Sequence, residues 1–119
     1  GSERVVLKIP AVLAPYKAAI LPLIKKDGLP EKAREIMAQL QLEYSVLYDE
    51  KDSIGKRYRR QDAIGTPFSI TVDHQTLEDN TVTIRDRDTM TQERIAIAAL
   101  ENVIADKASW KRVLSDLIS

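Results

Sequence analysis

Apolar residues follow two different spacings along this chain, and the order of these spacings is the strongest constraint on its fold. Residues 18–24 form a continuous apolar run, which is typical of a strand covered on both faces. Residues 30–44 carry apolar side chains at three- and four-residue spacing, as in an amphipathic helix that packs on a sheet. A strand at 45–48 and a helix at 53–64 repeat the pair. Because strands joined through helices run parallel with right-handed crossovers, this half predicts parallel strands.

The second half predicts antiparallel strands. Residues 68–73 alternate apolar and polar side chains, and residues 81–87 do so again after a turn at 77–80. Two such runs joined by a short polar loop predict a hairpin with one apolar and one polar face. A short extended piece at 93–97 and a helical region from residue 98 onward complete the order. We therefore predict a three-layer α/β domain with a mixed five-stranded sheet flanked by helices.

Single residues mark the ends of these elements. Pro30 suits the first turn of a helix, where a missing backbone N–H costs nothing. Ser53 can cap the second helix, and Gly65 can end it. Pro22 gives a sheet no donor and therefore predicts a strand end, an edge or a bulge. The residues predicted to form the inner face of the second helix are Ile54, Tyr58 and Ile64.

Composition narrows the class of protein. The chain has 119 residues, 44% of them hydrophobic and 30% charged, which suits one globular domain. Its 18 Lys and Arg residues balance 18 Asp and Glu residues, which excludes a strongly basic nucleic-acid coat and a polybasic membrane anchor. The absence of cysteine and the single histidine exclude disulfides, thiolate zinc sites and a multi-histidine metal cage. No apolar run approaches the about 20 residues that a membrane span needs.

The ends of the chain differ from its centre. Residues 1–2, Gly-Ser without an initiator methionine, are interpreted as the remnant of an expression tag. Residues 3–119 form the predicted domain, with a short lead-in strand at 5–9. Its tail, residues 108–119, contains Trp110 and has the apolar spacing of a helix.

No arrangement of residues predicts a catalytic site. Ser53 and Lys56 share the spacing of the serine–lysine pair of penicillin-binding enzymes, but the partner motifs are missing and a helix cap is the better interpretation. His74 has no second histidine and is expected at the surface. Asp86 and Asp88 leave one face of a strand, where pairing with neighbouring arginines is favoured over binding a cation. We therefore expect no cofactor and no metal in this domain.

A dense basic group on the second helix most strongly suggests a binding function. It consists of Lys56, Arg57, Arg59 and Arg60, interleaved with Tyr58. On the polar face of the predicted hairpin, Arg85 and Arg87 lie beside Thr83, with acidic and amide side chains at the tip. Guanidinium groups bind phosphates and base edges, and carboxylates accept from base amines, so these residues suit recognition of unpaired bases. The alternative is a solvated helix face that is neutralised by Asp49, Glu50, Asp52 and Asp62.

Longer runs of the sequence resemble a known family. These runs are residues 14–30, 48–51, 53–62, 64–68 and 77–90. They resemble the C-terminal anticodon-binding domain of dimeric class II glycyl-tRNA synthetases, over about residues 5–107. Two stretches depart from the family pattern: residues 97–100 lack a proline that the family often carries, and the tail 108–119 matches none of its motifs.

The resemblance implies recognition of the anticodon of the glycine tRNA, whose second and third letters are cytosines. The implied partners are the anticodon stem-loop of tRNA(Gly) and the catalytic domain of a parent enzyme in the cytoplasm, with no membrane and no DNA. ATP and Mg²⁺ would belong to that catalytic domain. The parent would be a homodimer, and the isolated domain a monomer.

Roles for single residues come from their position in the resemblance. Glu78, Arg85 and Arg87 are predicted to contact bases, with Asp88 as their orienting partner. The predicted phosphate contacts are Lys56, Arg57, Arg59 and Arg60, and the weaker candidates are Gln61 and Asp62. An alternative for some of these arginines is contact with the catalytic domain instead of RNA. A second hypothesis is a protein-interaction or accessory module of the same fold without base readout, in which the Trp110 tail packs on a partner.

Overall fold

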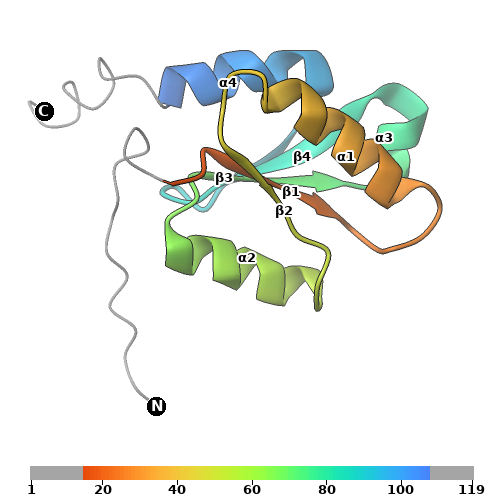
Figure 1. Ribbon diagram of the computed structural model, residues 1–119, viewed down its shortest axis with the longest axis horizontal. Helices are drawn as coiled ribbons and strands as arrows, with labels where there is room; N and C mark the ends of the chain where they lie inside the picture. The colour runs from red at the N-terminus through yellow and green to blue at the C-terminus, as the bar shows by residue number, and fades with distance from the viewer. Residues whose placement is uncertain (1–14, 108–119) are drawn as a thin grey trace, which may run out of the picture.

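The computed structural model describes residues 15–107 as a five-stranded sheet flanked by helices (Figure 1). In the strand order β2-β1-β3-β4-β5, β1 runs parallel to β2 and β3, and β4 is antiparallel to β3 and β5. The strands are β1 (Ala18–Pro22), β2 (Val46–Tyr48), β3 (Phe68–Val72), β4 (Thr81–Asp86) and β5 (Gln92–Ala96). The helices are α1 (Leu29–Leu40), α2 (Ile54–Ile64), α3 (His74–Asp79) and α4 (Leu100–Lys107), the last preceded by a 3-10 turn, η2 (Ile97–Ala99). The predicted three-layer architecture is confirmed.

The order of the strands explains why helices cover both faces of the sheet. The chain moves from β1 to β2 in one direction, and from β2 back past β1 to β3 in the other. Because parallel crossovers are right-handed, two crossovers in opposite directions place α1 and α2 on opposite faces. Figure 1 shows α2 on one side of the sheet and α1 and α4 on the other.

The face towards α1 and α4 carries the apolar core. From the central strands come Ile20, Ile70 and Ile84, each at most 4% exposed. Burial of a side chain of this size contributes about 1.5–3 kcal/mol, so this face supplies much of the apolar stabilisation. The other buried members of the cluster are Ala18, Leu29, Ala33, Ile36, Leu40, Val46, Phe68, Val72, Val82, Leu100 and Ile104.

The predicted helix ends are confirmed, with one change of length. Pro30 lies in the first turn of α1, and Gly28 before it has a φ of +80°, which glycine adopts without strain. Ser53 caps α2 by accepting a backbone hydrogen bond from its first turn, and Gly65 ends α2 with a φ of +83°. α1 ends at Leu40, about one turn earlier than the apolar spacing predicts.

The predicted inner face of α2 is confirmed for Tyr58, whose hydroxyl contacts that of Thr71 on β3, and is wrong for Ile64. The buried residues of α2 are Arg57 and Gln61, whereas Ile64 is 37% exposed and Ile54 and Tyr58 are half-buried. Besides the buried Ala19 and Leu21, the sheet face under α2 offers hydroxyl groups and backbone carbonyls. Polar side chains are therefore buried there with hydrogen-bond partners.

The connection between β3 and β4 is a helix rather than the predicted turn. α3 begins with a capping box: Asp73 accepts from the Thr76 backbone N–H, and the Thr76 hydroxyl accepts from the Asp73 backbone N–H. Asn80 ends α3 with a φ of +56°, a left-handed conformation that asparagine tolerates. The antiparallel pairing of β3 with β4 is as predicted, with Ile70 opposite Ile84.

Three predictions lie outside the described residues: the tag remnant at 1–2, the lead-in strand at 5–9 and the helical tail at 108–119. Between residues 15 and 107, no helix has the length and apolar character that crossing a lipid bilayer requires.

Candidate nucleic-acid interface

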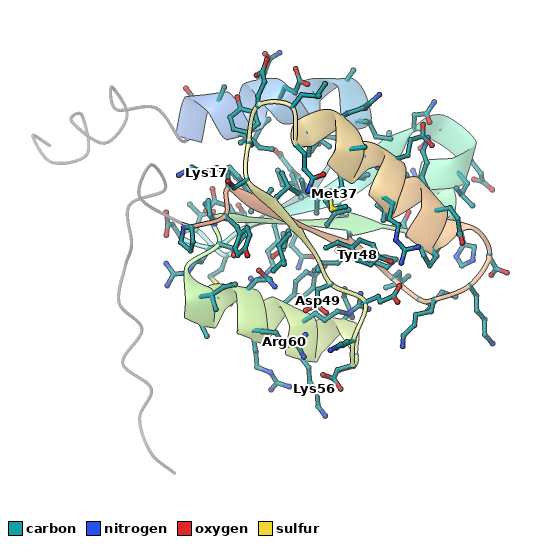
Figure 2. The ribbon with its side chains drawn as sticks, viewed as in Figure 1. Lys17, Met37, Tyr48, Asp49, Lys56 and Arg60 are labelled. Carbon is teal, nitrogen blue, oxygen red and sulfur yellow. The ribbon has the colours of Figure 1, made fainter. Side chains whose placement is uncertain are left out.

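The basic residues of α2 divide between its outer and inner sides. Lys56 and Arg59 are exposed, and Arg60 is half-buried. Together with Ala63 they border a shallow hollow, and Figure 2 shows Lys56 extending from α2 away from the sheet. Arg57 points inward and is 2% exposed. The prediction that all four cations share one surface is therefore wrong for Arg57.

Arg57 fixes α2 to the end of β1. Its guanidinium donates to the backbone carbonyls of Pro22 at 2.5 Å, Leu23 at 3.1 Å and Asp49 at 3.2 Å. Burial lowers the pKa of Arg57. A guanidinium with these partners cannot reach a phosphate outside the molecule without leaving the interior, so its predicted phosphate contact is replaced by a structural role.

Arg60 is balanced by neighbouring carboxylates. It forms an ion pair with the buried Asp49, which lies above it in Figure 2, and a second one, at 2.6 Å, with the exposed Asp52. The hydrogen bond that the Arg60 guanidinium donates to the Asp49 carboxylate is the largest reason why the pKa of Arg60 is raised. The alternative interpretation of a neutralised helix face is thus confirmed for this one residue. Lys56 and Arg59 are the exposed cations that remain for a phosphate.

Arg85 and Arg87 are held against α2 rather than displayed on an open hairpin face. The Arg85 guanidinium donates to the Asp62 carboxylate at 2.7 and 3.1 Å and lies over the Tyr58 ring, 5.3 Å from its centroid. Arg87 Nε donates to the Asp62 carbonyl at 2.9 Å, and its guanidinium lies 3.6 Å from Asp88. The two arginines are 9% and 8% exposed. The predicted exposure is wrong because the second crossover brings α2 over this face; their contacts with RNA stay a prediction.

Glu78 lies apart from these arginines. It is exposed on α3, which precedes β4, whereas Arg85 lies near the far end of β4. The four residue steps from Thr81 to Arg85 span about 13 Å of strand. Glu78 and Arg85 are therefore separated along β4 rather than adjacent at one tip, and their base contacts stay a prediction. Gln61 is fully buried and accepts a 2.8 Å hydrogen bond from the Thr66 hydroxyl, which gives this weaker candidate a structural role as well.

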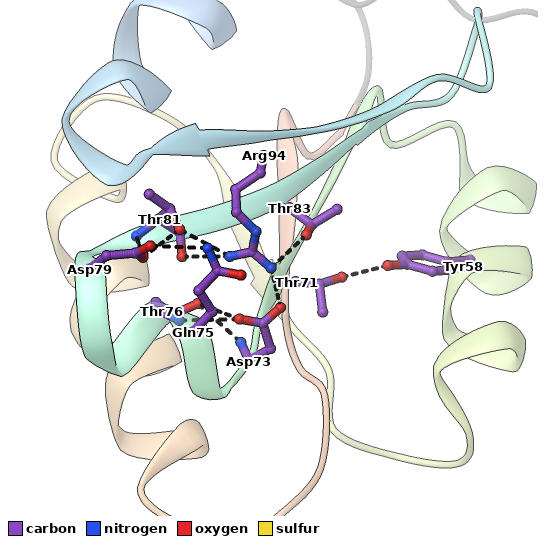
Figure 3. A network of polar contacts seen from close by, with 9 residues as sticks. All are labelled: Tyr58, Thr71, Asp73, Gln75, Thr76, Asp79, Thr81, Thr83 and Arg94. Atoms are coloured by element: carbon purple, nitrogen blue, oxygen red, sulfur yellow. Dashed lines mark hydrogen bonds and ion pairs between the residues drawn. The ribbon is translucent and has the colours of Figure 1, made fainter.

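A polar patch on the same sheet face extends the predicted polar face of the hairpin, which included Thr83, by two residues of β5 that the sequence predictions missed. It is formed by Thr81, Thr83, Gln92 and Arg94 on β4 and β5, beyond the area that α2 covers. The Arg94 guanidinium donates to the hydroxyls of Thr81 at 3.0 Å and Thr83 at 3.3 Å, and pairs with the Asp73 carboxylate (Figure 3). The Arg94 side chain stays 28% exposed. The sequence carries no signal for this contact, because only the pairing of β4 with β5 places Arg94 opposite Thr83.

The polar patch is ordered by its neighbours. Burial by itself would raise the pKa of Asp73, but hydrogen bonds from Arg94 and Thr76 outweigh it, so this pKa lies below its ordinary value. The charged carboxylate in turn positions Arg94. Next to the patch, the hydroxyls of Tyr58 and Thr71 are 2.5 Å apart, which joins α2 to β3 (Figure 3).

The remaining candidates give no catalytic or metal site. His74 is exposed as predicted, with Nε2 2.9 Å from the Asp27 carboxylate. Across the described part of the chain, no group of three or more histidine and carboxylate side chains is placed to hold a metal ion.

The sequence of this chain matches a known protein family. The family described as the anticodon binding domain matches residues 17–107. The chain belongs to this family. This anticodon-binding domain is 54% identical over 116 residues to the glycine–tRNA ligase of Borrelia hermsii. The alignment covers 98% of the chain and 26% of that ligase. It is 58% identical over 104 residues to the glycine–tRNA ligase of Clostridium beijerinckii, covering 87% and 22% respectively. The chain thus spans about a quarter of these relatives.

A solved structure supports the fold of this anticodon-binding domain. The RNA binding domain of threonyl-tRNA synthetase from Cryptosporidium parvum Iowa II superposes with a TM-score of 0.75 over 84% of the chain and 25% of that protein. The two sequences are 23% identical, so this likeness shows the shared fold and nothing further.

Proposed function

We propose that this chain reads the anticodon of the glycine tRNA as the anticodon-binding part of a glycine–tRNA ligase. The observation that carries the proposal is the family match together with relatives more than half identical that are named glycine–tRNA ligase. The exposed cations of α2 and the polar patch provide a surface for this function.

That surface has two parts with different chemistry. The outer side of α2 offers Lys56 and Arg59, and ammonium and guanidinium groups neutralise backbone phosphates without reading sequence. The polar patch offers the Gln92 amide, the Arg94 guanidinium and threonine hydroxyls, which can exchange hydrogen bonds with the edges of unpaired bases. Both parts lie on the α2 side of the sheet, so one single-stranded loop can contact both.

The test of base readout is a titration of the chain with tRNA(Gly) and with the same tRNA carrying other bases at its second and third anticodon positions. We expect each replaced cytosine to weaken binding by about 1–3 kcal/mol. Equal affinities would exclude base readout and favour the accessory-module hypothesis.

A matched pair of variants tests the surface. Arg94→Ala removes an exposed guanidinium from the polar patch, and Arg34→Ala removes one from α1 on the opposite face. We expect only Arg94→Ala to reduce the discrimination between the two tRNAs. Equal effects of the two variants would assign the loss to general charge instead.

The remaining properties of the ligase belong to the part outside this chain. The similarity to glycine–tRNA ligases supports the proposal that ATP and Mg²⁺ bind to the catalytic domain of the parent. We also propose that the parent is a cytoplasmic homodimer whose catalytic domain contacts this one.

A further inference from the structure

A groove opens on the face of the sheet opposite α2. It has a volume of about 380 Å³ and lies between α4, the end of β4 and the loop that joins β4 to β5. Its apolar floor is made by Phe68, Ile84 and Val103. Phe68 and Ile84 are each 4% exposed, whereas Val103 is half-buried at the margin of the core, so the apolar surface that the groove leaves uncovered is mainly that of Val103.

Carboxylates surround this apolar floor. Asp86, Glu93 and Asp106 line the groove from β4, β5 and α4. Asp86 also accepts backbone hydrogen bonds from Asp88 at 2.9 Å and Thr89 at 3.2 Å, which fixes one side of the groove. An occupant that matches this chemistry combines apolar side chains with cations.

The tail at 108–119 has that chemistry and begins at the groove. α4 ends at Lys107, one residue after the groove-lining Asp106. Trp110 follows Asp106 by four residues, a reach of at most about 14 Å. The tail carries two adjacent cations, Lys111 and Arg112. Its sequence also has four apolar residues at helical spacing, which are Trp110, Val113, Leu114 and Leu117.

The tail lies beyond the residues that the family model matches, but a relative has an aligned segment there. The family match ends at residue 107, whereas the alignment with the Borrelia hermsii ligase covers 98% of the chain and therefore most of the tail. We propose that residues 108–119 dock in this groove of their own chain, with Trp110 on the apolar floor and the two cations beside the carboxylates. Docking there leaves the α2 side of the sheet uncovered for RNA.

Trp110 is the one tryptophan of the sequence, so its fluorescence reports the docking directly. We expect the emission of the full chain to lie at shorter wavelength than that of a synthetic peptide of residues 108–119. We also expect acrylamide quenching of the chain to be several-fold weaker. Quenching as efficient as in the peptide would overturn the proposal, as would protection that is lost on dilution, because a second copy would then supply the tail.

Substitutions in and beside the groove test whether the tail docks there. Val103→Lys should shift the emission to longer wavelength, whereas Ala105→Lys, on an exposed part of α4 outside the groove, should not. Because Val103 contacts the core, Glu93→Lys on the exposed β5 is a second variant that does not threaten folding. It should raise quenching, because it replaces a carboxylate beside the tail cations with a like charge. Unchanged quenching in a folded Glu93→Lys chain would contradict the proposed contact.

Discussion

The two faces of the sheet are stabilised by different interactions. Towards α1 and α4, side chains such as Ile20 and Ile70 pack on apolar residues of the helices. Towards α2, the buried contacts include hydrogen bonds from Arg57 to three carbonyls and from Arg85 to Asp62. Hydrophobic burial has no directional requirement, whereas a buried polar group left without its partner costs about 1–3 kcal/mol. The apolar face therefore supplies stability, and the polar face supplies the defined position of α2.

The largest expected loss of stability comes from the apolar face. Ile70→Ala, at the centre of the sheet, removes a fully buried side chain and leaves a cavity. We expect a loss of about 2–5 kcal/mol in the free energy of unfolding, measured by denaturant titration with circular dichroism. Leu42→Ala, at a side chain that is 85% exposed, is the control and should change little. Comparable losses in both would contradict the assignment of the core.

A smaller loss is expected from the polar face. Arg57→Met keeps much of the side-chain volume but leaves three carbonyls without their donor. We expect a loss of about 1–3 kcal/mol in the free energy of unfolding. Lys56→Met at the neighbouring exposed position should stay within about 0.5 kcal/mol of the unchanged chain. If Arg57→Met stabilised the protein, desolvation of the guanidinium would outweigh its hydrogen bonds.

At the edge of the polar face, pH provides a third measurement. The folded pKa of Asp73 is lowered, so its contribution to stability is present above its ordinary value of 3.8 and is lost as the pH falls through the folded value. Asp73→Asn should therefore remove about 0.5–1 kcal/mol at neutral pH and flatten the acid side of the stability profile. In an Arg94→Ala background the same substitution should have less effect, because Arg94 is the charged partner. Parallel profiles in both backgrounds would show that the pair does not contribute.

Substitutions on the outer side of α2 should have the smallest effect on stability and the largest effect on the affinity for RNA. Lys56→Ala and Arg59→Ala should leave the free energy of unfolding within about 0.5 kcal/mol of the original. Each should lower the salt slope of tRNA binding by about 1 and weaken binding to all tRNAs alike. A loss confined to tRNA(Gly) would assign these cations to base readout.

The same contrast decides what could be predicted from the sequence. The strands and α1 were predictable because Ile20, Ile70 and their neighbours follow regular apolar spacings. The inner face of α2 was not, because a buried Arg57 has the same sequence signature as an exposed arginine. α3 could not be predicted because its six residues are mostly polar and show no apolar spacing. Arg94 was missed because a charged residue on an edge strand is ordinarily solvated, and only the fold places it beside Thr83.

The anchoring of α2 through Arg57 has a consequence for how its outer cations meet a ligand. A surface lysine on a mobile segment loses conformational entropy when it binds, and that loss is subtracted from the affinity. Here the backbone under Lys56 and Arg59 is already immobilised by bonds on the other side of the same helix. A ribose-phosphate strand would therefore encounter a preorganised array, and only the side-chain tips would need to become ordered.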